Sequence, residues 1–190
     1  IQTLIKVEAK KAVPVLVKRL KEVQEKSDLT AIQQALLQTP PKETIAELGS
    51  SLKKMKDEQL IIALDILAQR QAEKYFRFAL QQTKNKNVKV QSSALNAIGL
   101  MGTQKDVPVL LKQLTDPKNT NQDAFSDAII RILKREEDED RCKPIINAIN
   151  KAKPEKYTIL LSILAKVDDN SAQNFVLSWL NLPADVPQNK

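Results

Sequence analysis

Apolar residues recur along the chain at steps of three and four positions, the spacing of one buried face of an α-helix. Leu60, Leu64 and Leu67 form one such stripe, and residues 129–133 contain another. Polar segments separate the stripes, which predicts helices that alternate with short turns and linkers. First helices of successive pairs are expected over 28–38, 57–70, 88–101, 121–134 and 154–167. Second helices are expected over 8–24, 42–54, 72–83, 105–114, 140–151 and 171–182.

One segment of the sequence returns later in the chain. Residues 12–20 (AVPVLVKRL) recur as residues 106–114 (DVPVLLKQL), with Pro14 and Pro108 in equivalent places. The two prolines are 94 positions apart, about three times a period near 31. A fixed repeat of about 31 residues is typical of a stack of helical hairpins. We therefore expect an all-α fold, a right-handed α-α superhelix built as a solenoid of about five to six helical hairpins. Residues 1–182 should form this single solenoid, and residues 183–190 an irregular C-terminal tail.

Prolines and one tryptophan support these helix limits. Pro108 and Pro144 are predicted in the first turn of their helices, where the missing N–H group costs little. The pair Pro40-Pro41 should end one helix and begin the next. Trp179 lies in the last predicted helix, where we expect it to close the end of the core.

Residues 90–102 (VQSSALNAIGLMG) resemble a HEAT repeat, most closely the short bacterial variety also seen in bilin-lyase-like proteins. The signature residues are the small side chains Ala94 and Ala97, followed by a Gly-x-x-Gly pair. A second helix that ends at Leu114 and a short loop containing Asp116 complete the pattern. HEAT proteins are mostly scaffolds and adaptors. The resemblance therefore implies a HEAT-like solenoid with a binding function, and it carries no catalytic residues.

Composition narrows the class of protein further. No apolar run approaches the roughly 18 residues that a membrane-spanning helix needs, and no secretory signal is present. The chain starts at Ile1 without methionine, so we expect either a processed protein or a part of a longer one. Cys142 is the single cysteine, which excludes an internal disulfide bond. Cytoplasm and periplasm both stay open, and we expect a monomer.

The sequence offers little catalytic chemistry. It contains no histidine, the commonest general base and metal ligand. It also lacks a phosphate-binding glycine loop, a Cys-x-x-Cys pair and a nucleophile elbow. We therefore expect no enzyme activity, no cofactor and no metal. One alternative concerns Cys142, because Arg141 and Lys143 beside it would lower the pKa of a thiol near a helix start. The other interpretation is a neutral, partly buried cysteine.

The second helices predict a binding surface, because they line the concave face in a HEAT-like stack. Aligning them on their last apolar residue brings equivalent positions onto one side of each helix. This ladder contains no acidic residue; it is cationic at its start and rich in amides at its end. It predicts a groove for an anionic or hydrogen-bonding partner, although a merely solvated face is the competing interpretation. The predicted partner-binding residues are Lys18, Lys21, Lys42, Lys74, Phe78, Lys112, Lys143, Asn147, Asn174 and Ser178.

Charges also gather in the links between repeats. The formal net charge is +7, and lysine supplies most of the positive charge. We expect the lysine clusters to lie along one edge of the stack and the acidic run 136–140 along the opposite edge. That run lacks the ligand spacing and central glycine of a calcium loop, so we interpret it as solvated charge at a helix start. The lysine clusters are Lys53, Lys54 and Lys56; Lys84, Lys86 and Lys89; and Lys151, Lys153 and Lys156.

Three functions fit these observations. The first is a non-catalytic scaffold or adaptor that binds a protein partner with an acidic or polar surface. In this interpretation the chain can also be one module of a larger protein. The second is a nucleic-acid-binding HEAT-like protein with a basic concave face; arginines and aromatic residues, which favour such binding, are sparse here. The third is an accessory or lyase-like protein of the bilin-lyase type.

Overall fold

The computed structural model describes residues 2–138, 140–167 and 169–180. Within that part of the chain there are eleven α-helices and four short 3₁₀ helices, and no β-strand. The all-α fold class is therefore confirmed. The chain divides into two compact units, Ile1–Met101 and Gly102–Lys190. The superhelix over 1–182 stays a prediction, and the expected tail 183–190 lies outside the described residues.

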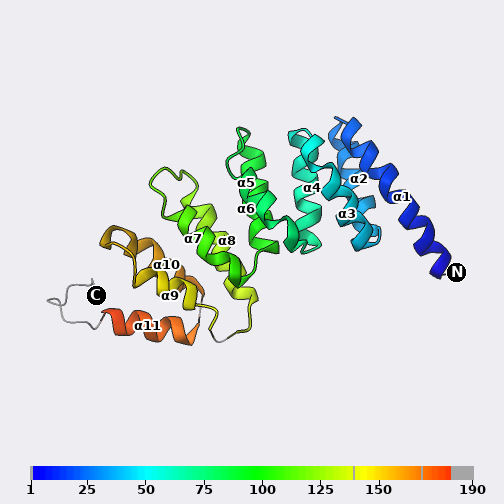
Figure 1. Ribbon diagram of the computed structural model, residues 1–190. Helices are drawn as coiled ribbons and strands as arrows, with labels where there is room; N and C mark the ends of the chain where they lie inside the picture. The colour runs from blue at the N-terminus through cyan, green and yellow to red at the C-terminus, as the bar shows by residue number, and fades with distance from the viewer. Residues whose placement is uncertain (1, 139, 168, 181–190) are drawn as a thin grey trace. The chain divides into compact units, whose positions relative to one another are not determined.

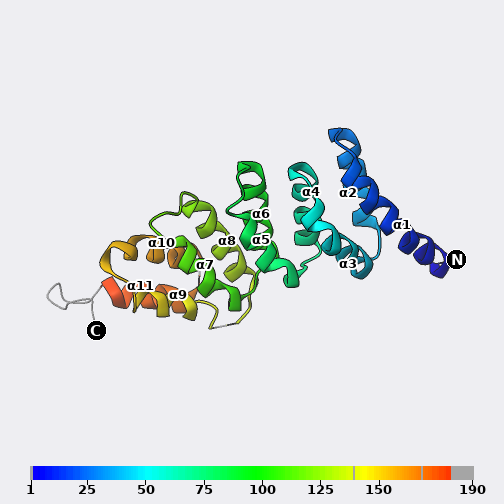
Figure 2. The ribbon, with the colours of Figure 1, turned by 45° about the horizontal axis from the view of Figure 1, so that its top comes forward.

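The first unit consists of helices that pack on their neighbours in sequence and on the equivalent helix of the next pair. Helix α1 contacts α2 and α3, α2 and α3 contact α4, and α6 contacts α4 and α5 (Figures 1 and 2). This pattern is the one expected for stacked hairpins. The elements are α1 (Gln2–Glu22), α2 (Lys26–Gln38), α3 (Pro41–Ser51), η1 (Leu52–Lys54), α4 (Asp57–Gln69), η2 (Glu73–Tyr75), α5 (Phe76–Gln82) and α6 (Val88–Met101).

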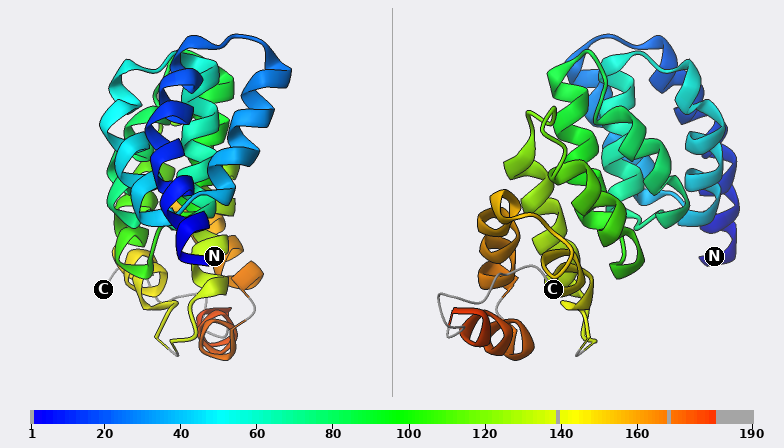
Figure 3. Two further views of the ribbon diagram at one scale, coloured as in Figure 1. Left: turned by 90° about the vertical axis from the view of Figure 1, so that its right-hand side faces the viewer. Right: turned by 60° about the vertical axis from the view of Figure 1, so that its left-hand side comes forward.

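The second unit repeats this arrangement. Helix α7 contacts α8 and α9, α10 contacts α8 and α9, and α11 packs on α10 (Figure 3). None of the described helices combines the length and apolar character that crossing a bilayer requires. The elements are η3 (Gln104–Asp106), α7 (Val107–Leu114), α8 (Gln122–Arg135), α9 (Lys143–Ile149), η4 (Pro154–Lys156), α10 (Tyr157–Val167) and α11 (Asn170–Leu180).

Some helix limits follow the sequence pattern, and others differ from it. Helices α5 and α10 begin later than predicted, at Phe76 and Tyr157, because the 3₁₀ turns η2 and η4 precede them. Helix α6 begins and ends where predicted, and α3 begins at Pro41. Helix α1 is longer than predicted, since it already begins at Gln2. Helix α9 is shorter, because the chain on both sides of it forms turns: Lys143 N–H donates to Asp140 O, and Ala152 N–H to Ile149 O, each three residues back.

The predicted apolar stripes form the cores. Leu60, Leu64 and Leu67 are buried, as are Ile129, Ile132 and Leu133 of the second stripe. Ile61 and Ile130, beside these stripes, are only half-buried. Each fully buried leucine contributes roughly 2 kcal/mol relative to an exposed one. Trp179 is half-buried on α11, where its ring meets the buried Tyr157 edge-on with centroids 5.1 Å apart. Trp179 therefore covers the α10–α11 core without being enclosed by it.

Polar side chains join hairpins at the repeat spacing. In the first unit the Gln33 amide donates to the Asp65 carboxylate, 32 residues away. Asn87 Nδ2 donates to Asp57 Oδ2 at 2.8 Å, across 30 residues. The Lys10 ammonium lies 2.9 Å from Glu43 Oε1. Each bond connects equivalent places in consecutive hairpins, so the period of the sequence is also the period of the contacts.

Two arginines complete helix ends that belong to the preceding hairpin. Arg70, just after α4, donates through Nη2 to the carbonyl oxygens of Leu37 and, at 3.0 Å, Thr39 at the end of α2. In the second unit Arg135, at the end of α8, donates to the carbonyl oxygen of Gly102. Carbonyls at a helix C-terminus lack partners within the helix, and a guanidinium supplies donors for them.

Candidate functional site

A surface depression lies along α7 and α9, which pack side by side in the second unit (Figure 1). Its volume is about 510 Å³. Apolar side chains from both helices share its lining with lysines and amides. The lining residues are Gln104, Pro108, Leu111, Lys112, Asp140, Lys143, Pro144, Asn147, Ala148 and Lys151.

Two rows of residues at four-residue steps line this depression. Lys112 and Pro108 lie one turn apart on α7, and Asn147 and Lys143 one turn apart on α9. Residues four apart lie on the same helix face, so two packed helices bring both rows to one surface. The structure therefore brings together Lys112, Lys143 and Asn147 of the predicted ladder.

The depression extends one turn beyond the predicted residues at both ends. Continuing the four-residue steps reaches Gln104 before α7 and Lys151 after α9, and both line it. The ladder did not include them: Gln104 precedes the predicted helix 105–114, and Lys151, the last residue of the predicted helix 140–151, was assigned to a lysine cluster of the links. Lys112, Lys143 and Lys151 give the depression an excess of positive charge.

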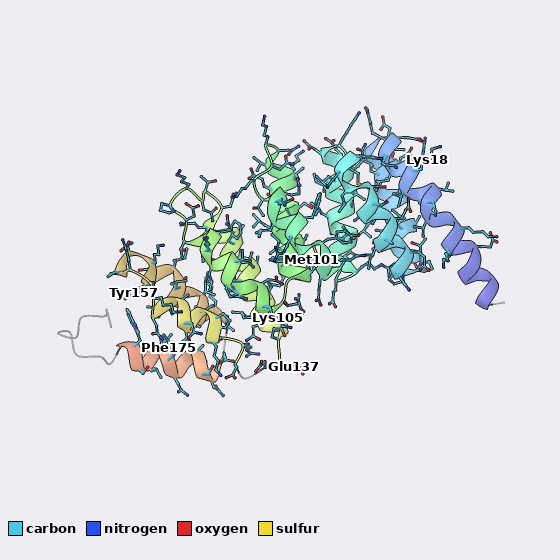
Figure 4. The ribbon with its side chains drawn as sticks, viewed as in Figure 1. Lys18, Met101, Lys105, Glu137, Tyr157 and Phe175 are labelled. Carbon is cyan, nitrogen blue, oxygen red and sulfur yellow. The ribbon has the colours of Figure 1, made fainter. Side chains whose placement is uncertain are left out.

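Asp140, the last residue of the acidic run, also lines the depression; it lies before α9, whereas Lys151 lies after that helix. The expectation that lysines and acidic residues occupy opposite edges stays a prediction. Gln104 holds the loop in place: its backbone N–H donates to Glu136 Oε1 at 3.3 Å and its Nε2 to Asp140 O at 2.9 Å. Figure 4 shows Lys105 and Glu137 at this end of the unit. The Asp140 carboxylate lies 2.5 Å from Lys143 Nζ. Both side chains are more than half exposed, so the pair contributes little to stability and exchanges readily.

The other ladder residues of the second unit lie on α11. Asn174 and Ser178 are exposed one turn apart on that helix, and neither is among the lining residues of the depression. Ser178 Oγ donates to the carbonyl oxygen of Phe175 in its own helix at 2.8 Å. They are therefore surface residues separate from the depression.

The remaining ladder residues belong to the first unit. Lys18 and Lys42 are exposed, and Lys21 is half-buried near the end of α1; Figure 4 labels Lys18 on that helix. Phe78 is half-buried on α5. The Lys74 ammonium lies 5.0 Å from the centroid of the neighbouring Tyr75 ring, a cation–π contact. A continuous ladder over both units stays a prediction.

A cluster that the sequence did not indicate surrounds the start of α9. Arg141 Nε lies 2.9 Å from Asp169 Oδ2, and these side chains are only 21% and 9% exposed. Arg141 Nη1 also donates to Glu136 O at 2.8 Å. Asp169 accepts from Ser171 Oγ and from Ala172 N–H. The hydrogen bond from Ser171, with help from Ala172 and Arg141, lowers the pKa of Asp169 below its ordinary value.

Cys142 is buried beside this ion pair. Burial, followed by the Asp169 charge, raises the pKa of the thiol to about 11, and Arg141 opposes the shift only in part. The hypothesis of an activated thiol is therefore wrong. The two basic neighbours of Cys142 in sequence do not set the environment of its thiol, because each pairs with a carboxylate. Arg141 forms an ion pair with Asp169, and Lys143 with Asp140.

Metal chemistry finds no support among these groups. Within the described ranges, no three carboxylate or thiol side chains gather closely enough to hold a metal ion. Of the acidic run, Glu139 lies outside those ranges.

Comparison with known proteins adds no identity to this geometry. No protein-family model matches the chain, and a search of the curated proteins finds no match.

Proposed function

We propose that the chain is a non-catalytic, HEAT-like binding scaffold that holds an acidic segment of a protein partner along α7 and α9. The observation that carries this proposal is the depression itself, whose lining combines Lys112, Lys143 and Lys151 with apolar side chains. Hydrogen bonds and ion pairs at the repeat spacing support the stacked-hairpin architecture. That architecture is suited to extended binding surfaces.

Electrostatics favour an acidic partner. Lys112 and Lys151 have no carboxylate in ion-pair range in the described structure, and Lys143 shares its charge with the exposed Asp140. A partner carboxylate can replace Asp140 at Lys143 without a large desolvation cost, because both groups are already hydrated. Asn147 adds an amide that both donates and accepts hydrogen bonds.

The apolar part of the lining favours a protein segment over a nucleic acid. Pro108, Leu111, Pro144 and Ala148 offer apolar contact to an aliphatic side chain. The lining contains neither an arginine, which pairs bidentately with phosphate, nor an aromatic ring on which a base stacks. An acidic peptide with one apolar anchor matches both halves of the surface.

Photo-crosslinking tests this proposal. A photoreactive amino acid replaces the exposed Asn147, and the protein is irradiated in an extract of its source cells. We expect one protein partner to be captured through Asn147, and capture to be lost after Lys112→Glu with Lys143→Glu. The same photoreactive residue at the exposed Thr158 on α10 serves as the positional control.

Charge reversal needs its own control. Lys134→Glu with Lys166→Glu makes the same change at exposed positions away from the depression. Equal capture from Asn147 and Thr158, or equal loss with both pairs of substitutions, would contradict a specific site. Capture of nucleic acid instead of protein would replace the proposal with the nucleic-acid alternative.

A further inference from the structure

The lysine clusters of the first unit lie together at one end of it. Lys53, Lys54 and Lys56 occupy the α3–α4 link, and the second cluster the α5–α6 link. Figures 1 and 3 show both links at the same end of the unit. The bond from Asn87 to Asp57 joins them directly, at 2.8 Å. The expectation that these two clusters share an edge is confirmed within this unit.

Hydrogen bonds shape the α5–α6 link. Asn87 N–H donates to Asn85 Oδ1 at 2.9 Å, and Lys89 N–H to Asn87 Oδ1 at 2.9 Å. Gln91 Nε2 donates to the Asn85 carbonyl oxygen. The asparagine side chains thus satisfy the backbone of the link, and the lysine side chains are left to the solvent.

Charge at this end is strongly unbalanced. All six lysines are exposed, and none of them lies within ion-pair distance of a carboxylate of the described chain. The two links carry no acidic residue; Asp57 and Glu58 follow in the first turn of α4, and Asp57 already accepts from Asn87. The neighbouring α1–α2 link is balanced by contrast, since Arg19 pairs with Asp28 there. Positive charge is therefore concentrated over two adjacent links.

An apolar side chain lies among these lysines. Val88, between Lys86 and Lys89 in sequence, is 69% exposed, more than any other large apolar residue of the described chain. It begins α6 at the outer end of the unit, so it has no core to face. An exposed valine surrounded by lysines is costly in water. It is favourable where the lysines meet anionic headgroups and the valine reaches the acyl boundary.

We infer that this end of the first unit, Lys53–Lys56 with Lys84–Lys89, docks on an anionic lipid surface. The lysines supply the electrostatic attraction. Each lysine near the surface raises the affinity for anionic lipid about fivefold. Val88 supplies a shallow apolar contact. A nucleic acid is the less suitable polyanion, because this end offers no arginine and no aromatic ring.

Vesicle co-sedimentation tests the charge requirement. The full chain is mixed with phosphatidylcholine vesicles that contain either no phosphatidylserine or about 30% of it, at about 0.15 M salt. We expect at least about tenfold tighter binding to the anionic vesicles. Lys84→Gln with Lys86→Gln should weaken that binding by about tenfold or more. Lys134→Gln with Lys166→Gln, the same charge change in the second unit, should leave it unchanged.

A fluorophore tests the apolar contact. A polarity-sensitive dye on Val88→Cys should shift to the blue on anionic vesicles, whereas the same dye on Glu73→Cys, at the other end of the unit, should not. The buried Cys142, whose pKa is about 11, should stay unlabelled in the folded protein. Circular dichroism confirms that each variant is folded.

Three outcomes would overturn the inference. Equal binding to neutral and anionic vesicles is one, and equal weakening by both lysine pairs is another. The third is binding to duplex DNA with the same lysine dependence while vesicles stay unbound, which would assign the surface to nucleic acid. A blue shift from both dye positions would likewise remove the role of Val88.

Discussion

At the residue scale, Gly49 on α3 leaves the space that Tyr75 fills. A Cβ atom at position 49 would lie 1.5 Å from the Tyr75 hydroxyl oxygen. That hydroxyl donates to the carbonyl oxygen of Ile45 at 3.2 Å. The Tyr75 ring also makes a cation–π contact with the Lys74 ammonium. One missing side chain therefore fixes the ring that covers this part of α3.

Gly49→Ala should test this coupling. Alanine improves helix propensity by about 1 kcal/mol, but displacing Tyr75 costs about 1–3 kcal/mol. We expect the substitution to lower the free energy of unfolding in the natural chain and to raise it by about 1 kcal/mol in the Tyr75→Ala background. Urea unfolding of the four proteins measures both signs. The same sign in both backgrounds would refute the coupling.

Asp169 should make the free energy of unfolding depend on pH in the acidic range. Its folded-state pKa lies below the unfolded value of 3.8. The stability it contributes is therefore fully present above pH 3.8 and is lost as the pH falls through the folded-state pKa. Asp169→Asn should destabilise the protein by about 1–3 kcal/mol at pH 7, because Arg141 loses its partner, and by less at low pH.

Urea midpoints measured at neutral and acidic pH report this difference. Glu43→Gln is the control, since hydrogen bonding from Lys10 also lowers the pKa of Glu43, but in a pair that is more exposed than Arg141 and Asp169. We expect little change from it at either pH. A destabilisation by Asp169→Asn that does not shrink toward low pH would show that the carboxylate charge is not the cause.

At the scale of elements, α4 ends in a left-handed residue. Gln71 has a φ of 50°. Its N–H donates to Ala68 O, and Ala72 N–H donates to Leu67 O, both at 2.9 Å, which is the Schellman pattern of helix ends. Glycine usually occupies this place, because a side chain there costs about 1 kcal/mol.

Two substitutions at this position should have opposite effects. Gln71→Val should destabilise the chain by about 1 kcal/mol, because a β-branched residue is poorly accommodated at positive φ. Gln71→Gly should stabilise it by up to about 1 kcal/mol, less the entropy that glycine adds to the unfolded chain. Thermal unfolding measures both. A more stable valine variant would contradict the assigned backbone geometry.

Element limits could be predicted from the sequence where composition changes sharply. Pro41 and the stripe of α6 are examples, since proline and apolar spacing act locally. The limits of α9 could not, because i→i+3 turns on both sides use the same residue types as the helix. Gln71 carried no signal at all: nothing in the sequence around it replaces the glycine that normally marks a left-handed helix end.

At the scale of the whole chain, stability should be distributed by unit. Leu64 is fully buried in the first unit and Leu110 in the second. Truncating either to alanine should cost about 2–5 kcal/mol. Since the chain forms two compact units, Leu64→Ala should accelerate amide hydrogen exchange mainly in residues 1–101. Leu110→Ala, its counterpart, should do so mainly in residues 102–190. Equal acceleration everywhere would indicate one cooperative body.

The candidate site was predictable only in part, for a physical reason. Four-residue steps bring Lys112, Lys143 and Asn147 to one depression, as helix geometry alone requires; that they bind a partner stays a prediction. The sequence did not indicate that Asp140 lines the depression, since its position depends on how Gln104 holds the preceding loop. The pairing of Arg141 with Asp169 was also missed. Such contacts between hairpins carry no local pattern.

The arginines that complete the preceding hairpin have a consequence for synthesis. Leu37 and Thr39 leave the ribosome some thirty residues before Arg70. The carbonyl oxygens of both residues accept hydrogen bonds from the Arg70 guanidinium. Thr39 itself donates to Leu36 O, but the Leu37 and Thr39 carbonyl oxygens lack their guanidinium donor until that arginine emerges. The nascent chain should therefore consolidate one hairpin behind the point of elongation, and a chain cut between α2 and α4 would carry a frayed terminus that the intact protein never shows.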